Sequence, residues 1–469
     1  MQNAQQKPKP FQRAVVIGAS IAGIMGARVL SDYFQQVILL DRDEHGQRPQ
    51  PRKGTPQSHH IHVLLRAGQD IIEEFFPGCL QEIEASGGAR IDAHHDFVWH
   101  HFGVWKTRFE SEAVMYLFTR PLLEYTLFER LRQISNIEIR ERTSVAGFLS
   151  SDGGRHITGV RLSDGESLQA DLVLDASGRG SRTVAWLEEL GYDRPPLEET
   201  GVDLAYVSRL YRRPATDAVP RDWRFLLHYP HSPHTWKSGF VMDVEEDRWI
   251  VSLNGYFKDH PPLDHNGFVD FARDLTRPDL HSMITAAEPL TDAIKFTIPR
   301  NSWRHFEKMG RFPSGLILIG DAVCALNPIF GQGMSVAAKE ALVLHRLLLQ
   351  CARRNSLAGL EHRARKQMAR VIGLPWFLTI CLDLHYPQTS GKKPLGHGFL
   401  MWYISRLMEL SSSSPYVYGE FFKVLMLKNG LWTILKPTVS LRVLAYGVMS
   451  FLVPLARRAN TDTLPAPAR

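Results

Sequence analysis

The sequence has 469 residues, of which 44% are hydrophobic and 22% charged, so the chain can bury a sizeable core and is neither a disordered segment nor a small disulfide-stabilised protein. Its net charge is +6, and its four cysteines form no C-x-x-C pair. This cysteine pattern argues against both a zinc site and a secreted disulfide framework, and favours the reducing cytoplasm.

The N-terminal segment predicts a strand, a glycine turn, a helix and a second strand. Two continuous apolar runs, typical of strands buried on both faces, flank a stretch whose apolar residues keep helical spacing. The turn GASIAG places Gly18 and Gly23 at the outer glycines of G-x-G-x-x-G, with Ser20 in the middle position. Asp41 ends the second strand, where an acid accepts hydrogen bonds from an adenosine ribose. The unit predicts binding of an adenine dinucleotide, and it fits NAD and FAD equally.

The middle of the chain is rich in strand patterns. Residues 90–110 mix aromatic residues with two histidine pairs in a strand-like rhythm, so about half of the histidines are expected to face solvent. The aromatic residues of this layer suit either a core or a substrate pocket; they are Phe97, Trp99, Phe102, Trp105, Trp223 and Phe225. An earlier cluster, HHIH at residues 59–62, has no carboxylate or cysteine at ligand spacing, so we predict no metal site.

A second glycine motif, GDAVCALNPIFGQGMS, follows the apolar run that ends at residue 319. Gly320 permits close passage of the backbone, and Asp321 can hydrogen-bond a ribityl hydroxyl or lie beside the phosphates. Gly331, Gly333 and Met334 begin a new helix, whose N–H groups can meet the N1 and O2 edge of a flavin ring. Reduced flavin is anionic at that edge, whereas NAD offers no comparable group, so this motif selects FAD.

The C-terminal region is helical in pattern and unusually apolar. Its apolar run at residues 443–455 falls short of the roughly 20 residues that a membrane-spanning helix needs. The segment from Phe421 onward contains seven basic residues and one acidic residue, so this tail carries the whole net charge. A neutral body with a basic, apolar tail argues against nucleic-acid binding and favours peripheral contact with an anionic membrane at its inner, cytoplasmic face. Packing on the core, or a dimer interface, is the alternative.

The predicted fold class is α/β, with an FAD-binding Rossmann-like βαβ domain interleaved with a mostly antiparallel substrate-domain sheet, plus an apolar helical C-terminal region. We assign residues 11–80, 111–190 and 301–350 to three segments of the FAD-binding domain. Residues 81–110 and 191–300 are assigned to the substrate sheet, and residues 351–469 to the C-terminal region.

With both glycine motifs, residues 11–350 resemble the FAD-dependent class A monooxygenases, which share the fold of para-hydroxybenzoate hydroxylase. Within that superfamily the chain is most similar to the bacterial polyene epoxidases of polyether pathways and, more distantly, to squalene epoxidase. The matching stretches are RKGTPQSHHIHVLL, RPLLEYTL, DLVLDASGRGSR, SRLYRRP, DRWIVSLNG and the second glycine motif. The resemblance implies a set of cofactor-binding residues, and it places HHIH near the adenosine or the flavin. That set is Gly18, Ser20, Gly23, Asp41 and Arg42 for the ADP half, Arg52 and Arg120 near the FAD, and Gly320, Asp321, Gly331, Gly333 and Met334 from the second motif.

The resemblance also implies a reaction. Reduced FAD forms a C4a-hydroperoxide with O2 and passes one oxygen atom to a lipophilic alkene or arene, by epoxidation or hydroxylation. This chemistry needs no acid or base from the protein, so no catalytic residue is assigned. Enzymes that take electrons directly from NAD(P)H usually carry D-G-x-x-S-x-x-R, where this chain has Ser177 and Val184 in place of the acid and the final arginine. We therefore expect NAD(P)H to be the ultimate electron donor, with the electrons supplied by a separate flavin reductase or by free reduced flavin.

Other functions fit the same cofactor. Flavin halogenases carry W-x-W-x-I-P, which is absent from this sequence. An FAD-dependent reductase or dehydrogenase of an isoprenoid-type substrate is the first alternative to a monooxygenase. A flavin-binding protein that docks on membranes without catalysis is the second.

Overall fold

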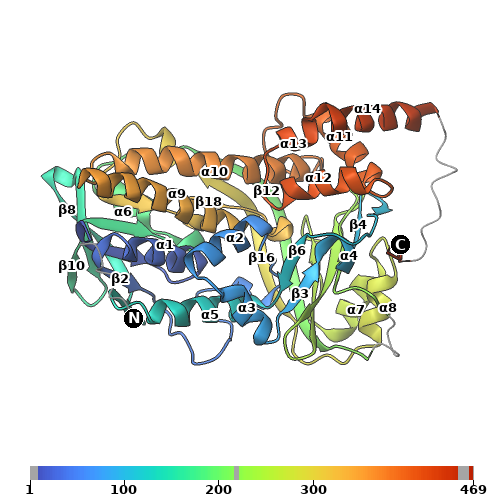
Figure 1. Cartoon of the computed structure of the whole chain (residues 1–469), viewed down its shortest axis with the longest axis horizontal. Helices are drawn as coiled ribbons and strands as arrows, with labels where there is room; N and C mark the ends of the chain where they lie inside the picture. The colour runs from blue at the N-terminus through green and yellow to red at the C-terminus, as the bar shows by residue number, and fades with distance from the viewer. Residues whose placement is uncertain (1–8, 216–220, 453–463, 468–469) are drawn as a thin grey trace, which may run out of the picture.

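The structure is a computed structural model that describes residues 9–215, 221–452 and 464–467. Helix α1 (Ile21–Ser31) lies on the left of Figure 1. On the right lie strands β3 (Ala89–Asp92), β4 (Phe97–His101) and β6 (Val114–Leu117), with helices α7 (His265–Arg273) and α8 (Asp279–Thr285). The C-terminal helices run along the upper edge, above both halves.

A parallel sheet of five strands forms the first half. Its order is β17-β11-β1-β2-β7, and each neighbouring pair is parallel. The strands are β1 (Phe11–Ile17), β2 (Phe34–Leu40), β7 (Ile137–Arg140), β11 (Leu172–Asp175) and β17 (Leu316–Leu318). Successive residues of β1 pack into different cores, Val15 into one and Val16 into the other. Both faces are therefore covered, as the continuous apolar runs predict, and the parallel sheet of the predicted α/β fold is confirmed.

Different elements cover the two faces of this sheet. One face shares its core with helices α1 (Ile21–Ser31), α2 (Arg66–Phe75), α3 (Cys79–Ala85), α5 (Arg120–Arg132) and α9 (Gly333–Arg354). The other face packs on α6 (Thr183–Glu189) and on a three-stranded sheet made of β8 (Val145–Ser151), β9 (His156–Leu162) and β10 (Ser167–Gln169). Helix α9 contacts α1, α2 and α10 (Leu360–Asp383), so it joins the first layer to the C-terminal helices.

The second half is built on an eight-stranded sheet of order β18-β16-β12-β15-β14-β13-β4-β5. Its strands are β4 (Phe97–His101), β5 (Val104–Trp105), β12 (Leu197–Arg212), β13 (Phe225–His228), β14 (Lys237–Val244), β15 (Arg248–Gly255), β16 (Ile294–Arg304) and β18 (Cys324–Ala325). Only the β13 and β4 pair is parallel among the pairs described. Strand β18 belongs to the second glycine motif, so this motif leaves the parallel sheet at β17 and reaches the edge of the large sheet within a few residues.

The secondary structure of residues 90–110 differs from the strand pattern that the sequence predicts. Strand β3 (Ala89–Asp92) pairs with β6 (Val114–Leu117) in a separate two-stranded sheet, and a short helix, α4 (Ala93–Asp96), begins where the Asp92 side chain accepts the His94 N–H. The expectation that half of the histidines face solvent is wrong, because His94, His100 and His101 are all buried. Helices α7 (His265–Arg273) and α8 (Asp279–Thr285) pack on the far face of the large sheet, so neither face is open there.

Five helices follow residue 359 in the described part of the chain. They are α10 (Leu360–Asp383), α11 (His397–Leu410), α12 (Pro415–Leu425), α13 (Trp432–Leu435) and α14 (Pro437–Leu452). Among the residues described, none of the helices combines the length and the apolar character needed to cross a membrane. The basic pair Arg457 and Arg458 of the predicted membrane-binding tail lies outside the described residues. The predicted segment boundaries stay predictions.

The first glycine turn generates a stability prediction. A Cβ built on Gly23 would lie 1.7 Å from the Gly18 carbonyl oxygen, whereas one built on Gly180 would meet no neighbour within 4 Å among the residues described. We expect Gly23→Ala to lower the free energy of unfolding by at least about 2 kcal/mol, because backbone atoms cannot yield as a side chain can. The matched variant Gly180→Ala should change it by less than about 0.5 kcal/mol. Urea unfolding monitored by circular dichroism checks both values, and equal stabilities would contradict the close approach.

Candidate functional site

The first part of the site lies where β1 ends and α1 begins. Gly18 has a φ of +95°, its N–H donates to the Leu40 carbonyl at 2.7 Å, and a Cβ at this position would lie 2.7 Å from the Ala176 carbonyl oxygen. Ser20 precedes the helix, but its side chain does not cap it. Its Oγ instead donates to Glu124 Oε1 and accepts from Arg120 Nη2, both at 2.7 Å. The first N–H groups of α1 are thus left for a ligand, and the helix dipole favours an anion there.

Glu124 brings the two predicted arginines together. It lies on α5, four residues after Arg120, whose Nε donates to Oε1 at 2.9 Å. The other carboxylate oxygen accepts from Arg52 Nη2 at 3.0 Å. Burial opposes the charge of this carboxylate, but Arg120 and Arg52 outweigh it and hold the pKa of Glu124 below its usual value. The sequence analysis missed Glu124, although an acid four residues after an arginine is a recognisable helical pair.

Asp41 joins this cluster from the end of β2. Its Oδ2 accepts the Ala19 N–H at 2.8 Å, and Arg52 Nη1 lies 3.3 Å away. Burial raises the pKa of Asp41, but hydrogen bonds from His45 and from the Asp43 N–H, with the charge of Arg52, lower it to about 2. The carboxylate is therefore ionised and able to accept ribose hydroxyls. Arg42 is exposed beside it.

His60 and His62 of the HHIH segment contact different parts of the structure. His62 Nδ1 donates to the His60 carbonyl at 2.9 Å, which leaves Nε2 as the acceptor that faces Arg120 Nη1 at 3.2 Å. His60 instead lies against the large sheet, with Nδ1 2.7 Å from Ser208 Oγ on β12. No cluster of three or more His, Cys, Asp or Glu side chains among the described residues could hold a metal ion.

The second glycine motif is held by two residues that the sequence analysis missed. Gly320, with a φ of +64°, donates its N–H to Glu340 Oε2 at 2.8 Å. Glu340 lies on α9, and burial raises its pKa to about 8. Asp321 Oδ2 accepts from Arg179 Nε at 3.1 Å, and Arg179 also donates to the Leu326 carbonyl at 2.7 Å. The turn after β11 and the turn after β17 are therefore joined beside the cofactor motifs.

The start of α9 is open. Gly331 takes a left-handed φ of +64°, and a Cβ on it would lie 3.4 Å from Val63 Cβ. No atom from another described segment lies within 4 Å of a Cβ built on Gly333, the first residue of the helix. The Met334 side chain is buried in the core, so its predicted role in cofactor binding would rest on its backbone N–H. A second uncapped helix N-terminus thus faces open space.

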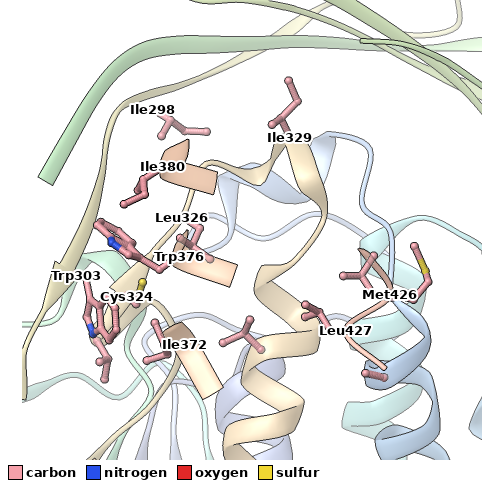
Figure 2. Close-up of a cluster of buried hydrophobic side chains, with 14 of the residues drawn as sticks. Ile298, Trp303, Cys324, Leu326, Ile329, Ile372, Trp376, Ile380, Met426 and Leu427 are labelled. Atoms are coloured by element: carbon pink, nitrogen blue, oxygen red, sulfur yellow. The ribbon is translucent and has the colours of Figure 1, made fainter. Parts of the chain in front are cut away.

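Helix α10 packs against the loop that runs from the end of β17 to the start of α9. Figure 2 shows Ile372, Trp376 and Ile380 of this helix near the loop residues Cys324 and Leu326, and Ile329 belongs to the same buried hydrophobic cluster. A buried polar network continues the contact, since Asp383 accepts from Asn301 Nδ2 at 2.8 Å, and from Asn327 Nδ2 and Tyr256 OH at 3.2 Å each. Thr379 Oγ1 donates to Gln332 Oε1 at 3.2 Å, at the other end of the loop. Helix α10 therefore contacts the loop between β17 and α9 through both apolar packing and hydrogen bonds.

One face of the large sheet meets the same loop with aromatic side chains. Tyr229 OH donates to the Ile329 carbonyl at 2.7 Å, and its ring lies 5.8 Å from Trp99 and 6.4 Å from Phe330. The six predicted aromatic residues divide between the two faces of the sheet. Phe97, Trp99, Phe102 and Phe225 belong to the core on the side of the loop, whereas Trp105 and Trp223 lie in the core below α7 and α8.

These residues fit an FAD molecule. Two uncapped helix starts, two arginine forks and an ionised aspartate match a pyrophosphate, a ribose and an anionic flavin edge. A protein-family profile described as "FAD binding domain" matches residues 12–372.

The chain belongs to this FAD-binding family. The predictions of an FAD-binding domain and of FAD as the cofactor are thereby confirmed. The roles of the individual residues stay predictions.

Individual proteins are also similar to this FAD-binding chain. Protein Rv3254 of Mycobacterium tuberculosis is 28% identical over 97% of this chain and 98% of its own length. Among solved structures, the flavin-dependent brominase Bmp2 aligns with a TM-score of 0.65 and 15% identity over 88% of this chain and 92% of its own. PqsL of Pseudomonas aeruginosa aligns with a TM-score of 0.58 and 18% identity over 80% of this chain and 97% of its own. At such identities the solved structures establish the shared fold alone.

The network around Asp383 generates a pH prediction. Burial raises the pKa of Asp383 from its ordinary value of 3.8 to about 7, although its three hydrogen bonds oppose that shift. The folded protein therefore holds this proton more tightly than the unfolded chain, and the resulting stabilisation is lost as the pH rises from about 4 to about 7. We expect the free energy of unfolding of the wild type, relative to Asp383→Asn, to fall by about 2–4 kcal/mol over this range.

Urea unfolding at a series of pH values checks this difference. Asp270→Asn, which changes an exposed aspartate, should track the wild type at every pH. A constant difference between the wild type and Asp383→Asn would show that Asp383 does not titrate in this range.

Proposed function

We propose that this FAD-binding protein is a monooxygenase that inserts one oxygen atom from O2 into a lipophilic alkene or aromatic substrate, by epoxidation or hydroxylation. The observation that carries the proposal is the contact of the aromatic sheet face with the flavin motif, through Tyr229 and Ile329. An apolar substrate held by this face lies against the loop that begins α9. Bound FAD, once reduced, supplies the activation of O2.

The chain's own residues would hold and shield the reactants. Arg52, Arg120 and Asp41 would bind the ADP half, and the N-terminus of α9 would stabilise negative charge on the flavin ring. The buried rings of Trp99, Phe97 and Phe225 would orient an apolar substrate and exclude water. No described acid or base in this layer is required for the oxygen transfer, so we assign no catalytic residue.

Some of the structures that share the fold are named for oxygenation, and their names do not select a substrate. PqsL is described as a probable FAD-dependent monooxygenase, whereas Bmp2 is described as a brominase. The halogenase motif W-x-W-x-I-P is absent from this sequence, which favours oxygenation over halogenation. Similarity to polyene epoxidases favours an alkene as the substrate.

The source of electrons is proposed from the turn after β11. Ser177 occupies the position of the usual acid, and its Oγ donates to Asp175 Oδ1 at 2.5 Å. Ser181 and Thr183 donate to the other oxygen of Asp175, so three hydroxyl groups of this turn hydrogen-bond to one carboxylate. We propose that NAD(P)H delivers its electrons through a separate flavin reductase.

The function is tested by isotope incorporation. The FAD-loaded protein is photoreduced under nitrogen and mixed with 18O2 and either geranylgeraniol or 2-naphthol as the probe. We expect one 18O atom in the product, and Trp99→Leu should lower its yield at least about tenfold because it removes a ring beside the flavin loop. Trp223→Leu, on the opposite face of the same sheet, should leave the yield unchanged while both variants keep their FAD. Addition of two hydrogens to the alkene under nitrogen would favour the reductase alternative.

We also propose peripheral contact with an anionic membrane through the outer face of α14. This helix packs inward through Val439, Val443 and Gly447, the last against Trp402 of α11. Its outward side chains include Leu441, 65% exposed, and Val448, 60% exposed. The sequence of α14 contains no acidic residue. In Figure 1 this helix lies with α11 and α13 at the upper right edge of the molecule.

The apolar face continues onto neighbouring helices. Trp432 of α13 is 71% exposed and Phe399 of α11 is 66% exposed. A broad apolar face beside a tail with an excess of basic residues complements an anionic lipid surface better than it complements the neutral body of a second copy.

Liposome flotation tests this membrane contact. We expect the wild type to bind vesicles of phosphatidylcholine with 30% phosphatidylglycerol, and the triple variant L441S/V448S/M449S to bind about tenfold less because it removes apolar area from the interface. The control L197S/L263S/L290S changes three exposed leucines elsewhere and should bind like the wild type. Equal binding by both triple variants would contradict the proposed face, and loss of a dimer by the α14 variant would assign the face to a second copy.

A further inference from the structure

A cavity of about 310 Å³ lies beside the second glycine motif. We call it the arginine cavity, because Arg179, Arg300 and Arg304 all line it. Ala325 of β18 forms another part of its wall, so the cavity adjoins the motif directly. The side chain of Arg300 is 56% exposed, so solutes can reach the cavity from the surface. Among the described residues that line it, none belongs to the predicted site of the ADP half.

The register of the large sheet gathers part of this lining on one face. Ser302 of β16 lies opposite Glu199 of β12 and Ala325 of β18, and directly opposite side chains share a face in an antiparallel pair. Arg300 and Arg304 lie two residues before and after Ser302, so strand alternation turns them to the same face. One strand therefore places two of the three cations in the cavity.

The second glycine motif orients two of the three guanidinium groups. Arg179 donates to Asp321 Oδ2 at 3.1 Å and to the Leu326 carbonyl at 2.7 Å. Arg304 Nη1 donates to the Ala322 carbonyl at 3.2 Å. An arginine carries five N–H donors, and most of those on both side chains have no acceptor among the residues described. These donors are available to a ligand in the cavity.

The charges around the cavity favour an anion. Glu199 lines it and pairs with Arg300 at 3.1 Å, but both side chains are exposed, so this ion pair is weak. Arg304 forms no ion pair within the described part of the chain. Even with Asp321 counted against Arg179, the guanidinium groups outnumber the carboxylates. Forks of N–H donors match the oxygen atoms of a phosphate monoester, which carries about two negative charges at neutral pH.

The size of the cavity and the rest of its lining indicate an organic phosphate. Pockets that enclose a whole small-molecule ligand measure about 300–1,000 Å³, so a cavity of about 310 Å³ suits one end of a ligand better than a complete dinucleotide. Phe296 is half-buried and adds an apolar wall beside the arginines. The second glycine motif forms the adjoining wall, so a ligand anchored here by its phosphate lies next to the predicted flavin site.

We propose that the arginine cavity binds the phosphate group of a small organic reactant, with Arg179, Arg300 and Arg304 as the residues that hold it. The proposal rests on the proposed function, because a reactant is expected here only where the glycine motifs hold FAD. Two sources of the phosphate share this chemistry. One is free reduced FMN released by the reductase, which would give two electrons and a proton to FAD and leave as oxidised FMN. The other is a phosphorylated lipophilic substrate.

Matched probes test the cavity in the FAD-loaded protein. Isothermal titration calorimetry at low ionic strength, where exposed charges are least screened, compares FMN with riboflavin and geranyl phosphate with geraniol. Each pair differs only in its phosphate group. We expect the phosphorylated member of at least one pair to bind at least about tenfold more tightly, because the arginine forks hold its charge. A preference for FMN assigns the cavity to the electron donor, and a preference for geranyl phosphate assigns it to the substrate.

Two variants remove single charges from the cavity. We expect Arg300→Gln and Arg304→Gln each to reduce the preference for the phosphorylated probe at least about fivefold while the protein keeps its FAD. Arg212→Gln is the matched control, because Arg212 lies on β12 of the same sheet and pairs with an exposed glutamate, Glu288, at 2.7 Å. This control should keep the full preference.

Equal affinities within both probe pairs, or an unchanged preference in both cavity variants, would overturn the proposal. The wild-type comparison decides the first point even where a variant fails to fold. The FAD content before and after each titration shows that FMN has not replaced FAD. These titrations need no oxygen transfer, so loss of the 18O product with an intact phosphate preference would overturn the proposed function alone.

Discussion

The carboxylate of Glu124 is buried between the guanidinium groups of Arg52 and Arg120, and the geometry of the phosphate-binding end follows from it. A buried charge is tolerated only with close partners, so the glutamate holds both arginines beside the start of α1. It also accepts the Ser20 hydroxyl, which would otherwise cap that helix. A single carboxylate thus keeps the helix N-terminus bare and places two cations beside it. The two arginines and the bare helix N-terminus are therefore already in place to bind a pyrophosphate.

The second constraint is the short path of the chain from β17 to α9. Within this path the backbone ends a strand of the parallel sheet, pairs with the edge of the large sheet at β18, and then begins the helix whose N-terminus is open. The parallel sheet carries the cofactor motifs, and the large sheet carries the aromatic face. Because one loop belongs to both sheets, the cofactor motifs of the first sheet and the aromatic face of the second meet at residues that are covalently continuous. Arg179 and Asp321 hold this junction from the side of the turn after β11.

Helix α10 extends the site beyond the part of the chain that matches the FAD-binding family, which ends at residue 372. Thr379 and Asp383 lie past that point, yet Thr379 hydrogen-bonds to Gln332 and Asp383 to Asn327, both in the loop between β17 and α9. The C-terminal helices therefore help to hold the second glycine motif, and they also form the exposed face on α14. Their apolar composition has two physical origins, since part of it packs against the loop and part faces outward.

Local patterns in the sequence determined the strand, turn and helix order, the acid at the end of β2 and the choice of FAD, because these depend on residues close together in the chain. Backbone strain at Gly18 and bare N–H groups at a helix start leave such local signatures. The distant partners of buried polar groups do not, since Glu124 and Arg52 are 72 positions apart, Arg179 and Asp321 are 142 apart, and Asp383 and Asn327 are 56 apart. The aromatic residues of the middle region were recognised as a group, but only the second layer of helices decided which face each one joins. His60 and His62 are two residues apart and read alike in the sequence. Only the packing of their segment between the arginine cluster and the large sheet gave them different partners, because burial and hydrogen bonding are properties of the assembled structure.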